Sequence, residues 1–279
     1  MAQKVWFITG CSTGFGRELA RYTLERGDKV VVTARKPAEI ADLVAGRETN
    51  ALALELDVTK SGDIAAAVAA AEAKFGRIDV LVNNAGIGYF GAVEESEDAE
   101  VRRMFEINFW GLANMSRAVL PGMRARRSGH IVNISSMGGM RGAPAVGYYN
   151  ATKFGLEGLS EALAQEVEPL GIKVLIVEPS GFRTDWAGRS ANQTPHPIAD
   201  YDATAGARQR AIRGYSGKQP GDPIRAAAAI VEAVEAENPP LRLMLGKAAL
   251  AAGRAKVEAL RKDFEDWAAV SEGADYPQG

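Results

Sequence analysis

The sequence has few of the residues on which disulfides, metal sites and histidine chemistry depend. Among its 279 residues, Cys11 is the only cysteine, and the histidines are His130 and His196. A single cysteine excludes a disulfide within the chain, and nothing indicates an oxidising compartment. Neither histidine has the spacing of a metal ligand, such as H-E-x-x-H, so we expect no metal site. His130 is expected to open a strand.

Charge of one sign and long apolar runs are also absent. The formal net charge is −2, and the most basic cluster, Arg124, Arg126 and Arg127, is expected to lie in a solvated loop. Nucleic acids are bound through clustered Lys and Arg, so we expect no nucleic-acid partner. No apolar run reaches the roughly 18–20 residues that span a bilayer, and the first residues lack a secretory signal pattern. We expect a cytoplasmic protein with no membrane segment.

The sequence does contain an alternation of short apolar runs and helical stretches. Most runs are continuously apolar, as in a parallel sheet covered on both faces. The expected strands are Lys4–Thr9, Lys29–Thr33, Ala51–Leu56, Ile78–Val82, His130–Ser135, Ile172–Glu178 and Leu241–Leu245. The expected helices are Phe15–Arg26, Pro37–Ala45, Gly62–Phe75, Ser96–Arg126, Tyr148–Pro169 and Asp222–Glu237. This order predicts one α/β domain over residues 1–270: a doubly wound parallel sheet (Rossmann fold) of about seven strands with helices on both faces.

Two segments depart from the alternation. Residues 184–221 include Trp186 and several prolines and tyrosines but no strong strand, and a connection of this length is typical of a substrate-covering lid or binding loop. After the last strand, an apolar stripe at helical spacing is expected to pack on the chain's own body or on a partner subunit. The stripe consists of Leu250, Val257, Leu260, Phe264 and Trp267. Residues 271–279 are expected to form a flexible tail.

The glycine-rich stretch T-G-C-S-T-G-F-G, Thr9–Gly16, allows two interpretations. Gly10 to Gly14 match G-x-S-x-G, the turn that exposes a hydrolase serine, which would make Ser12 a nucleophile. The whole stretch also matches a strand–turn–helix junction whose backbone N–H groups bind the pyrophosphate of a dinucleotide. A hydrolase needs a later acid and a histidine base, and neither histidine has such a context. We therefore favour the phosphate site, with Ser12 and Thr13 lining the turn.

A tyrosine–lysine pair stands in the stretch Y-Y-N-A-T-K. Tyr149 and Lys153 are four residues apart on a predicted helix, so they share one face, whereas Tyr148 has Thr152 at that offset. A nearby ammonium lowers the pKa of a phenol from its usual value of about 10. A decrease of about three units needs roughly 4 kcal/mol, to which Lys153 and a bound cationic nicotinamide ring would both contribute. Such a tyrosine exchanges a proton with a ketone or an alcohol.

Seven motifs follow one another in an order that resembles the short-chain dehydrogenase/reductase family over residues 4–245. They are T-G-x-x-x-G-x-G at 9–16, Asp57, N-N-A-G at 83–86, Asn108, N-I-S-S at 133–136, Y-x-x-x-K at 149–153 and P-S-G-F-R-T at 179–184. One departure is Ser180, because the family usually has glycine directly after that proline. The resemblance implies an enzyme that binds a nicotinamide dinucleotide.

The resemblance also implies a catalytic set. Tyr149 corresponds to the proton donor and acceptor, and Lys153 to the residue that holds the nicotinamide ribose and tunes the tyrosine. The family serine precedes its tyrosine by thirteen residues, which selects Ser136 to align the substrate oxygen. Ser135 is expected to point to the opposite face of the strand. Asn108 corresponds to the asparagine that completes a proton relay.

The cofactor contacts implied by the resemblance come from several separate segments. The glycine turn binds the pyrophosphate, Asp57 and Val58 contact the adenine, the Asn83–Gly86 turn flanks the adenosine half, and residues 179–184 close over the carboxamide. The expected cofactor-binding residues are Gly10, Ser12, Thr13, Gly14, Phe15, Gly16, Arg35, Asp57, Val58, Asn84, Ala85, Gly86, Tyr149, Lys153, Pro179, Gly181 and Thr184.

The end of the second strand indicates which nicotinamide cofactor is bound. NAD-binding folds place a carboxylate there, against the ribose 2′-hydroxyl. This strand runs V-V-V-T-A-R-K, with Ala34 and Arg35 and no carboxylate before Glu39. A guanidinium binds a 2′-phosphate through charge-assisted hydrogen bonds, which a carboxylate would repel. We expect NADP(H) rather than NAD(H).

These patterns predict an oxidoreductase that transfers a hydride between NADP(H) and a small-molecule carbonyl/secondary-alcohol pair. Apolar residues beside the motifs favour a medium-sized apolar substrate, and the expected substrate contacts are Ser136, Met137, Tyr149 and Trp186. The alternative is a non-catalytic regulator that senses NADP(H), although such a protein is expected to lack the tyrosine or the lysine. The resemblance further implies a homodimer or homotetramer, joined through the helices that hold Asn108 and Tyr149.

Overall fold

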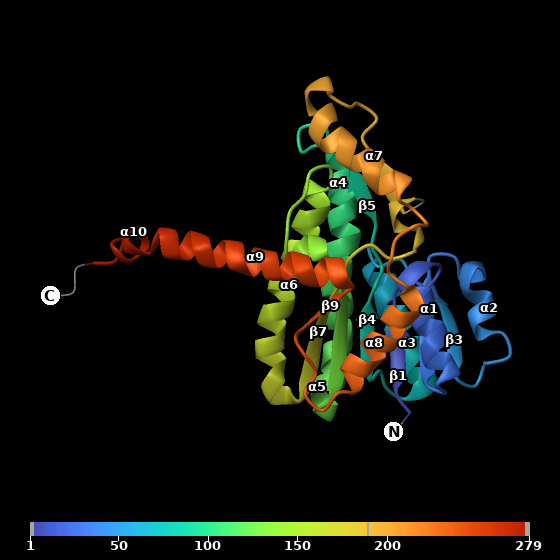
Figure 1. The fold of residues 1–279 in the computed structure, drawn as a ribbon. Coiled ribbons are helices and arrows are strands. Elements are labelled where there is room, and N and C mark those ends of the chain that lie inside the picture. The colour runs from blue at the N-terminus through green and yellow to red at the C-terminus, as the bar shows by residue number, and fades with distance from the viewer. Residues whose placement is uncertain (1–2, 189, 277–279) are drawn as a thin grey trace.

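The computed structural model describes residues 3–188 and 190–276 of the chain. Its centre is a sheet of seven parallel strands in the order β3-β2-β1-β4-β6-β7-β9 (Figure 1). The strands are β1 (Val5–Ile8), β2 (Lys29–Ala34), β3 (Ala51–Glu55), β4 (Val80–Asn83), β6 (Gly129–Ile134), β7 (Ile172–Pro179) and β9 (Arg242–Leu245). The predicted doubly wound α/β fold is confirmed, because each of the seven expected strands coincides with a strand of this sheet.

Helices cover both faces of the sheet (Figure 1). The helices are α1 (Gly14–Glu25), α2 (Ala41–Val44), α3 (Ser61–Phe75), α4 (Asp98–Phe105), α5 (Leu112–Arg126), α6 (Gly147–Val167), α7 (Ala207–Gly214), α8 (Pro223–Glu235), α9 (Lys247–Asp266) and α10 (Ala268–Glu272). Successive residues of β1 point to opposite faces. Trp6 and Ile8 pack in one core with Leu19 of α1, and Phe7 packs in the other with Ile64 of α3. The continuously apolar strands therefore bury both of their faces.

The sheet brings its functional segments to one edge. All seven strands run in the same direction, so the turns that follow β1, β4, β6 and β7 lie at a common carboxyl edge. Chain winding reverses between β1 and β4, because β2 and β3 extend to one side of β1 and the later strands extend to the other. Doubly wound folds bind their ligands in the crevice at such a reversal.

The structure differs from the expected elements in two places near this edge. The segment 184–221 contains β8 (Ala191–Gln193), which pairs with β5 (Gly88–Phe90) in a second sheet of two strands. A three-residue strand is too short for a period-two pattern to show in the sequence. The helix expected over Ser96–Arg126 is interrupted by a π-helical stretch, η2 (Glu106–Gly111), between α4 and α5.

The last two helices extend away from the body of the protein (Figure 1). Ala249 and Gly253, near the start of α9, are buried, but most of the predicted apolar stripe beyond them is exposed. Packing on the chain's own body is therefore limited to the first turns of α9. Helix α10 continues to Glu272, so Ser271 and Glu272 are helical rather than part of a tail, and residues 277–279 lie outside the described residues. Among the described residues, no helix combines the length and the apolarity needed to cross a membrane.

Candidate active site

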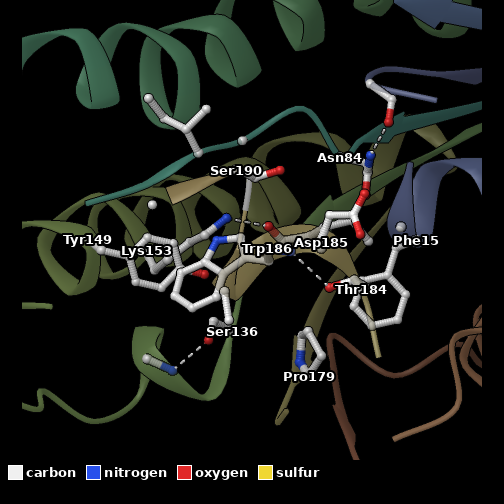
Figure 2. A pocket seen from close by; sticks show the side chains of 18 of the residues that line it. Phe15, Asn84, Ser136, Tyr149, Lys153, Pro179, Thr184, Asp185, Trp186 and Ser190 are labelled. Atoms are coloured by element: carbon white, nitrogen blue, oxygen red, sulfur yellow. Dashed lines mark hydrogen bonds between the residues drawn. The ribbon is translucent and has the colours of Figure 1, made fainter. Parts of the chain in front are cut away.

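A cavity of about 1330 Å³ lies at the carboxyl edge of the sheet, between the turn after β1 and the segment 184–221 (Figure 2). It brings together nearly all of the residues expected from the sequence. The expected residues that line it are Gly10, Ser12, Thr13, Gly14, Phe15, Arg35, Asp57, Val58, Asn84, Ala85, Gly86, Ser136, Met137, Tyr149, Lys153, Pro179, Gly181, Thr184 and Trp186. Gly16 and Asn108 are not among its lining residues.

The glycines of the first turn have distinct physical roles. Gly10 and Gly14 adopt φ values of 71° and 62°, which L side chains rarely allow. Gly16 is helical, but a Cβ there would lie 2.4 Å from Asn84 Nδ2 and 2.5 Å from the Gly10 carbonyl oxygen. Asn84 Nδ2 donates to the carbonyl oxygens of Thr9 (2.8 Å) and Gly10 (2.9 Å), which fixes the turn. Gly16 therefore acts by allowing close packing and does not line the cavity.

The amino terminus of α1 has the features of an anion site. Among the described residues, Thr13 at the N-cap makes no side-chain capping hydrogen bond, and the first turn of α1 carries no acidic residue. The first N–H groups of a helix have no partner within it, and the helix dipole favours negative charge at that end. The residues of this turn thus fit the pyrophosphate of a dinucleotide.

Cys11 and the two histidines give no support to the hydrolase alternative. Cys11 points into the core, where its Sγ lies 3.2 Å from the Ile8 carbonyl oxygen and burial raises its pKa to about 12. His130 is the second residue of β6, at the opposite end of the sheet from Ser12, and burial beside Lys4 lowers its pKa to about 4. Neither histidine is among the described residues that line the cavity. Among the described residues, no histidine is therefore placed to activate Ser12.

Three of the expected catalytic side chains meet in the cavity (Figure 2). Tyr149 and Lys153 lie on the same face of α6, and both are buried. Lys153 Nζ donates to the Ile134 carbonyl oxygen at 2.7 Å and lies 5.7 Å from the centre of the Tyr149 ring. Ser136 interacts with Tyr149 through a side-chain hydrogen bond and accepts another from the backbone N–H of Gly138 at 3.0 Å. A serine hydroxyl, a phenol and an ammonium thus converge at one point.

The pKa of Tyr149 is set mainly by burial. Burial raises it to about 12, and the hydrogen bond with Ser136 only partly opposes this. Burial also lowers the pKa of Lys153 to about 8, although Glu157 one turn later favours its charged form. The ammonium lies over the ring of Tyr149 and donates to the Ile134 carbonyl oxygen, and desolvation remains the main cause of the raised pKa of the phenol. Burial therefore favours the neutral form of the Tyr149 phenol.

Asn108 occupies the π-helical stretch but does not reach the cavity. Its Nδ2 donates to the Ile87 carbonyl oxygen (2.9 Å) and to Thr152 Oγ1 (3.2 Å), and its Oδ1 accepts from the Ile87 N–H (2.8 Å). The side chain therefore joins the turn after β4 to α6 next to Tyr149. Its contacts are those of a residue that positions the site, and π-helical stretches often occur at functional sites.

The two asparagines of N-N-A-G have different surroundings. Asn84 lines the cavity, whereas Asn83 is buried between β4 and β6. Asn83 Nδ2 donates to Ser116 Oγ (3.1 Å) and Asn133 Oδ1 (2.9 Å), and Asn133 Nδ2 donates to Ser160 Oγ (2.8 Å). Of this pair, only Asn84 is placed to contact a cofactor, and Asn83 connects strands and helices behind the site.

The segment 184–221 forms one wall of the cavity and contributes the predicted Trp186 together with residues that the sequence did not single out. Trp186 packs against Tyr149 with ring centres 4.9 Å apart, and against Phe90 edge-on at 5.7 Å. Arg213 lies over the Phe90 ring and donates to the Ala191 carbonyl oxygen at 2.8 Å, which holds this wall in place. One face of α7 also lines the cavity, at the helical spacing of Arg208, Ala211, Ile212 and Tyr215. The i, i+3, i+4, i+7 spacing of these four residues is the sequence pattern from which this helix face could have been predicted.

A buried ionic cluster lies behind the catalytic residues. Arg242 of β9 binds Glu157 of α6 at 2.7 Å and also binds Glu178, which is fully buried at the end of β7. Glu157 accepts a hydrogen bond from Ser135 Oγ at 2.5 Å. Ser135 thus faces this cluster while Ser136 faces Tyr149, as the alternation of side chains along an extended segment predicts. The cluster connects the segments that carry Ser136, Lys153 and Pro179.

The far end of the cavity lies at the end of β2. Ala34 and Arg35 line it, and Arg35 is exposed. Glu39, which belongs to the following 3₁₀ helix, lines the same end, and its carbonyl oxygen accepts from Arg17 Nη1 at 3.2 Å. Arg35 and Glu39 therefore both border this end of the cavity.

Comparisons with known proteins show which family has this arrangement. A curated relative, Oxidoreductase BOA17 of Botryotinia fuckeliana, is 40% identical over 270 residues, which are 96% of this chain and 98% of the relative. A 3-ketodihydrosphingosine reductase of Bacteroides thetaiotaomicron is also 40% identical, over 88% of this chain and 89% of the relative. The crystal structure of a short-chain dehydrogenase from Streptomyces avermitilis is 44% identical with a TM-score of 0.92, covering 99% of this chain and 100% of that one.

Two further solved structures are complexes with nicotinamide cofactors. A short-chain dehydrogenase/reductase from Burkholderia phymatum, in complex with NAD, is 25% identical with a TM-score of 0.82 over 94% of this chain and 95% of that one. A metagenomic short-chain oxidoreductase, in complex with NADP, is 34% identical with a TM-score of 0.60 over 64% of this chain and 83% of that one. The family model for short chain dehydrogenases matches residues 4–195. With that match and near-complete coverage of relatives at 40% identity, this chain belongs to the short-chain dehydrogenase family.

Proposed function

We propose that this chain transfers a hydride between NADP(H) and a carbonyl/secondary-alcohol pair, with Tyr149 as the general acid and base. The observation that supports this most is the convergence of Ser136, Tyr149 and Lys153 in a cavity whose other end is the anion-binding terminus of α1. The family relationship supports a nicotinamide cofactor, and solved relatives hold NAD or NADP. The cofactor, when bound, supplies or accepts the hydride.

The proposed roles of the protein side chains follow from their positions. Ser136 holds the substrate oxygen by a hydrogen bond, which orients the carbonyl toward Tyr149. Tyr149 then donates its proton to the oxygen that becomes the alcohol. Because burial keeps the phenol protonated at neutral pH, the ground state of the site is prepared for carbonyl reduction. Lys153 supplies positive charge 5.7 Å from the centre of the phenol ring.

The substrate is proposed to be medium-sized and mostly apolar. Met137, Val146 and Trp186 line the cavity around Tyr149, and Ile212 of α7 lines it from the segment 184–221. Trp186 packs directly on the Tyr149 ring, so a substrate whose oxygen reaches Tyr149 would also contact the indole. Burial of apolar surface against these side chains would stabilise a bound alicyclic or aromatic ketone.

A panel of cyclic and aryl ketones, with NADPH and NADH in parallel, tests this function. Nicotinamide absorbance is followed for the ketones, and the matching alcohols are assayed with NADP⁺ and NAD⁺. We expect turnover of apolar members with NADPH. Tight NADPH binding without turnover of any ketone or alcohol would contradict the enzyme and support the regulator that senses NADP(H).

Arg35 is proposed to bind the 2′-phosphate of NADP(H). Arg35→Ser is expected to raise the Kd for NADPH about 10- to 100-fold, since a hydrogen bond to a charged group contributes about 1.5–3 kcal/mol. The Kd for NADH should change less than about twofold, because no 2′-phosphate is present. Titration of cofactor fluorescence measures both constants. Arg47→Ser, at an exposed arginine outside the cavity, is the matched control. An equal increase in the Kd for NADPH and the Kd for NADH would show that Arg35 does not bind the 2′-phosphate.

A further inference from the structure

The outer part of α9, together with α10, is an exposed apolar surface that we call the arm (residues 257–270). Val257, Phe264 and Trp267 are 60%, 67% and 64% exposed, and Val270 is exposed as well. The arm extends into solvent beyond the body of the protein (Figure 1). Large apolar side chains lose stabilisation when they remain in water, and isolated helices of this length are only marginally stable. The arm therefore has the properties of a surface that a partner covers.

The spacing of the apolar residues indicates that the partner is another helix. Apolar residues and one glycine follow α9 at alternating steps of three and four: Leu250, Gly253, Val257, Leu260, Phe264 and Trp267. This is the seam of a helix that pairs side by side with a second helix. The body of the chain covers the seam at Gly253, where a Cβ would lie 2.4 Å from Met244 Sδ. Leu250 and the apolar residues of the arm lie on the same seam, and other described residues do not cover them.

Charges along α9 indicate how the two helices run. The inner half, residues 247–256, carries three basic residues and no acidic one. Residues 258–266 carry four acidic residues and two basic ones, and Arg261 and Lys262 already pair with Glu258 and Asp266 inside the helix. An antiparallel partner with the same sequence would place an acidic outer half against a basic inner half. A parallel partner would place like charges together, and the acidic outer half would be repelled by an anionic membrane surface.

We propose that the arm pairs antiparallel with the α9 helix of a second copy of this chain. A two-fold axis between Val257 and Leu260 would bring Trp267 of each copy toward Leu250 of the other, which covers both exposed ends of the seam. This contact is separate from the one expected through the helices of Asn108 and Tyr149, where Trp110 and Phe154 are exposed. It does not depend on the reaction that the cavity catalyses.

Phe264→Glu tests the contact through the mass of the assembly. Light scattering coupled to size-exclusion chromatography is expected to show half the wild-type mass for this variant, with unchanged circular dichroism and thermal unfolding of the body. Ile224→Glu, at a residue of α8 that is 55% exposed, is the control and should keep the wild-type mass. A monomeric wild type, or a Phe264→Glu variant with wild-type mass, would overturn the proposal. So would binding of wild type to anionic vesicles that Phe264→Glu abolishes.

A cross-linking experiment tests the direction of pairing. The only native cysteine is buried, so an added cysteine provides one accessible thiol. Val257→Cys lies near the two-fold axis and is expected to form covalent dimers with a short bismaleimide. Ala269→Cys should not, because the two thiols of an antiparallel pair would be roughly 30 Å apart along the helices. Cross-linking at position 269 as well as at 257 would show a parallel pair and contradict the charge argument.

Discussion

Tyr149→Phe is expected to lower kcat for ketone reduction by about 10²- to 10⁴-fold, the range that a positioned general acid contributes. The substitution removes the hydroxyl that hydrogen-bonds with Ser136 and leaves the ring that packs on Trp186, so the cavity should keep its shape. The Kd for NADPH should therefore change less than about threefold. Steady-state kinetics and cofactor fluorescence measure the two quantities separately.

Tyr148→Phe is the matched control for this prediction. Tyr148 is the neighbouring residue on α6, but it is not among the described residues that line the cavity. Its variant should keep at least half of the wild-type kcat. If Tyr149→Phe retained full turnover, or if both variants lost activity equally, Tyr149 would not be the proton donor.

Arg242→Met is expected to lower the free energy of unfolding at pH 8 by about 3–5 kcal/mol, the cost of leaving buried charges without their partner. Glu157 and Glu178 are both buried, and Arg242 is their common counter-charge. Methionine keeps much of the apolar stem, so packing changes little. Chemical denaturation measures the loss. Arg102→Met, at an exposed i,i+4 pair with Asp98, should cost less than about 1 kcal/mol.

The pH dependence of the stability lost in Arg242→Met distinguishes an effect of charge from an effect of packing. Burial and the neighbouring Glu157 raise the pKa of Glu178 from 4.5 to about 7, although Arg242 opposes the shift. The folded chain thus binds this proton more tightly than the unfolded chain, and the contribution of Glu178 to stability falls as pH rises from about 4.5 to 7. Without Arg242 the fall should be larger. We expect a smaller deficit for Arg242→Met at pH 5 than at pH 8, and an equal deficit would indicate lost packing instead.

The elements that the sequence predicted well are those whose signal is local. The central strands are mostly apolar because both of their faces are buried, and a run such as V-V-V-T indicates this burial without any knowledge of its neighbours. The residues that line the cavity could likewise be predicted from the sequence, because the carboxyl ends of parallel strands must meet at one edge. Their chemical roles remain proposals, since position alone does not establish a reaction.

The features that the sequence did not predict depend on contacts between distant segments. The pKa of Tyr149 depends on how completely the segment 184–221 and α6 exclude water, which no i,i+4 spacing reports. Asn83 and Asn84 are adjacent in one motif, yet only their partners decide which faces the cavity. Arg242 and Glu157 are 85 residues apart and carry no shared pattern. The apolar stripe of α9 could be recognised in the sequence, but its exposure to solvent could not.

Transfer of deuterium from NADPH labelled at the hydride position tests the central proposal most directly. The ketone with the highest turnover is reduced with the labelled cofactor, and the alcohol is analysed by mass spectrometry. One deuterium on the carbinol carbon, at a rate that Tyr149→Phe reduces at least about a hundredfold, is the predicted result. An alcohol without deuterium, or labelled alcohol formed equally fast by Tyr149→Phe, would contradict hydride transfer in the cavity with Tyr149 as its proton donor.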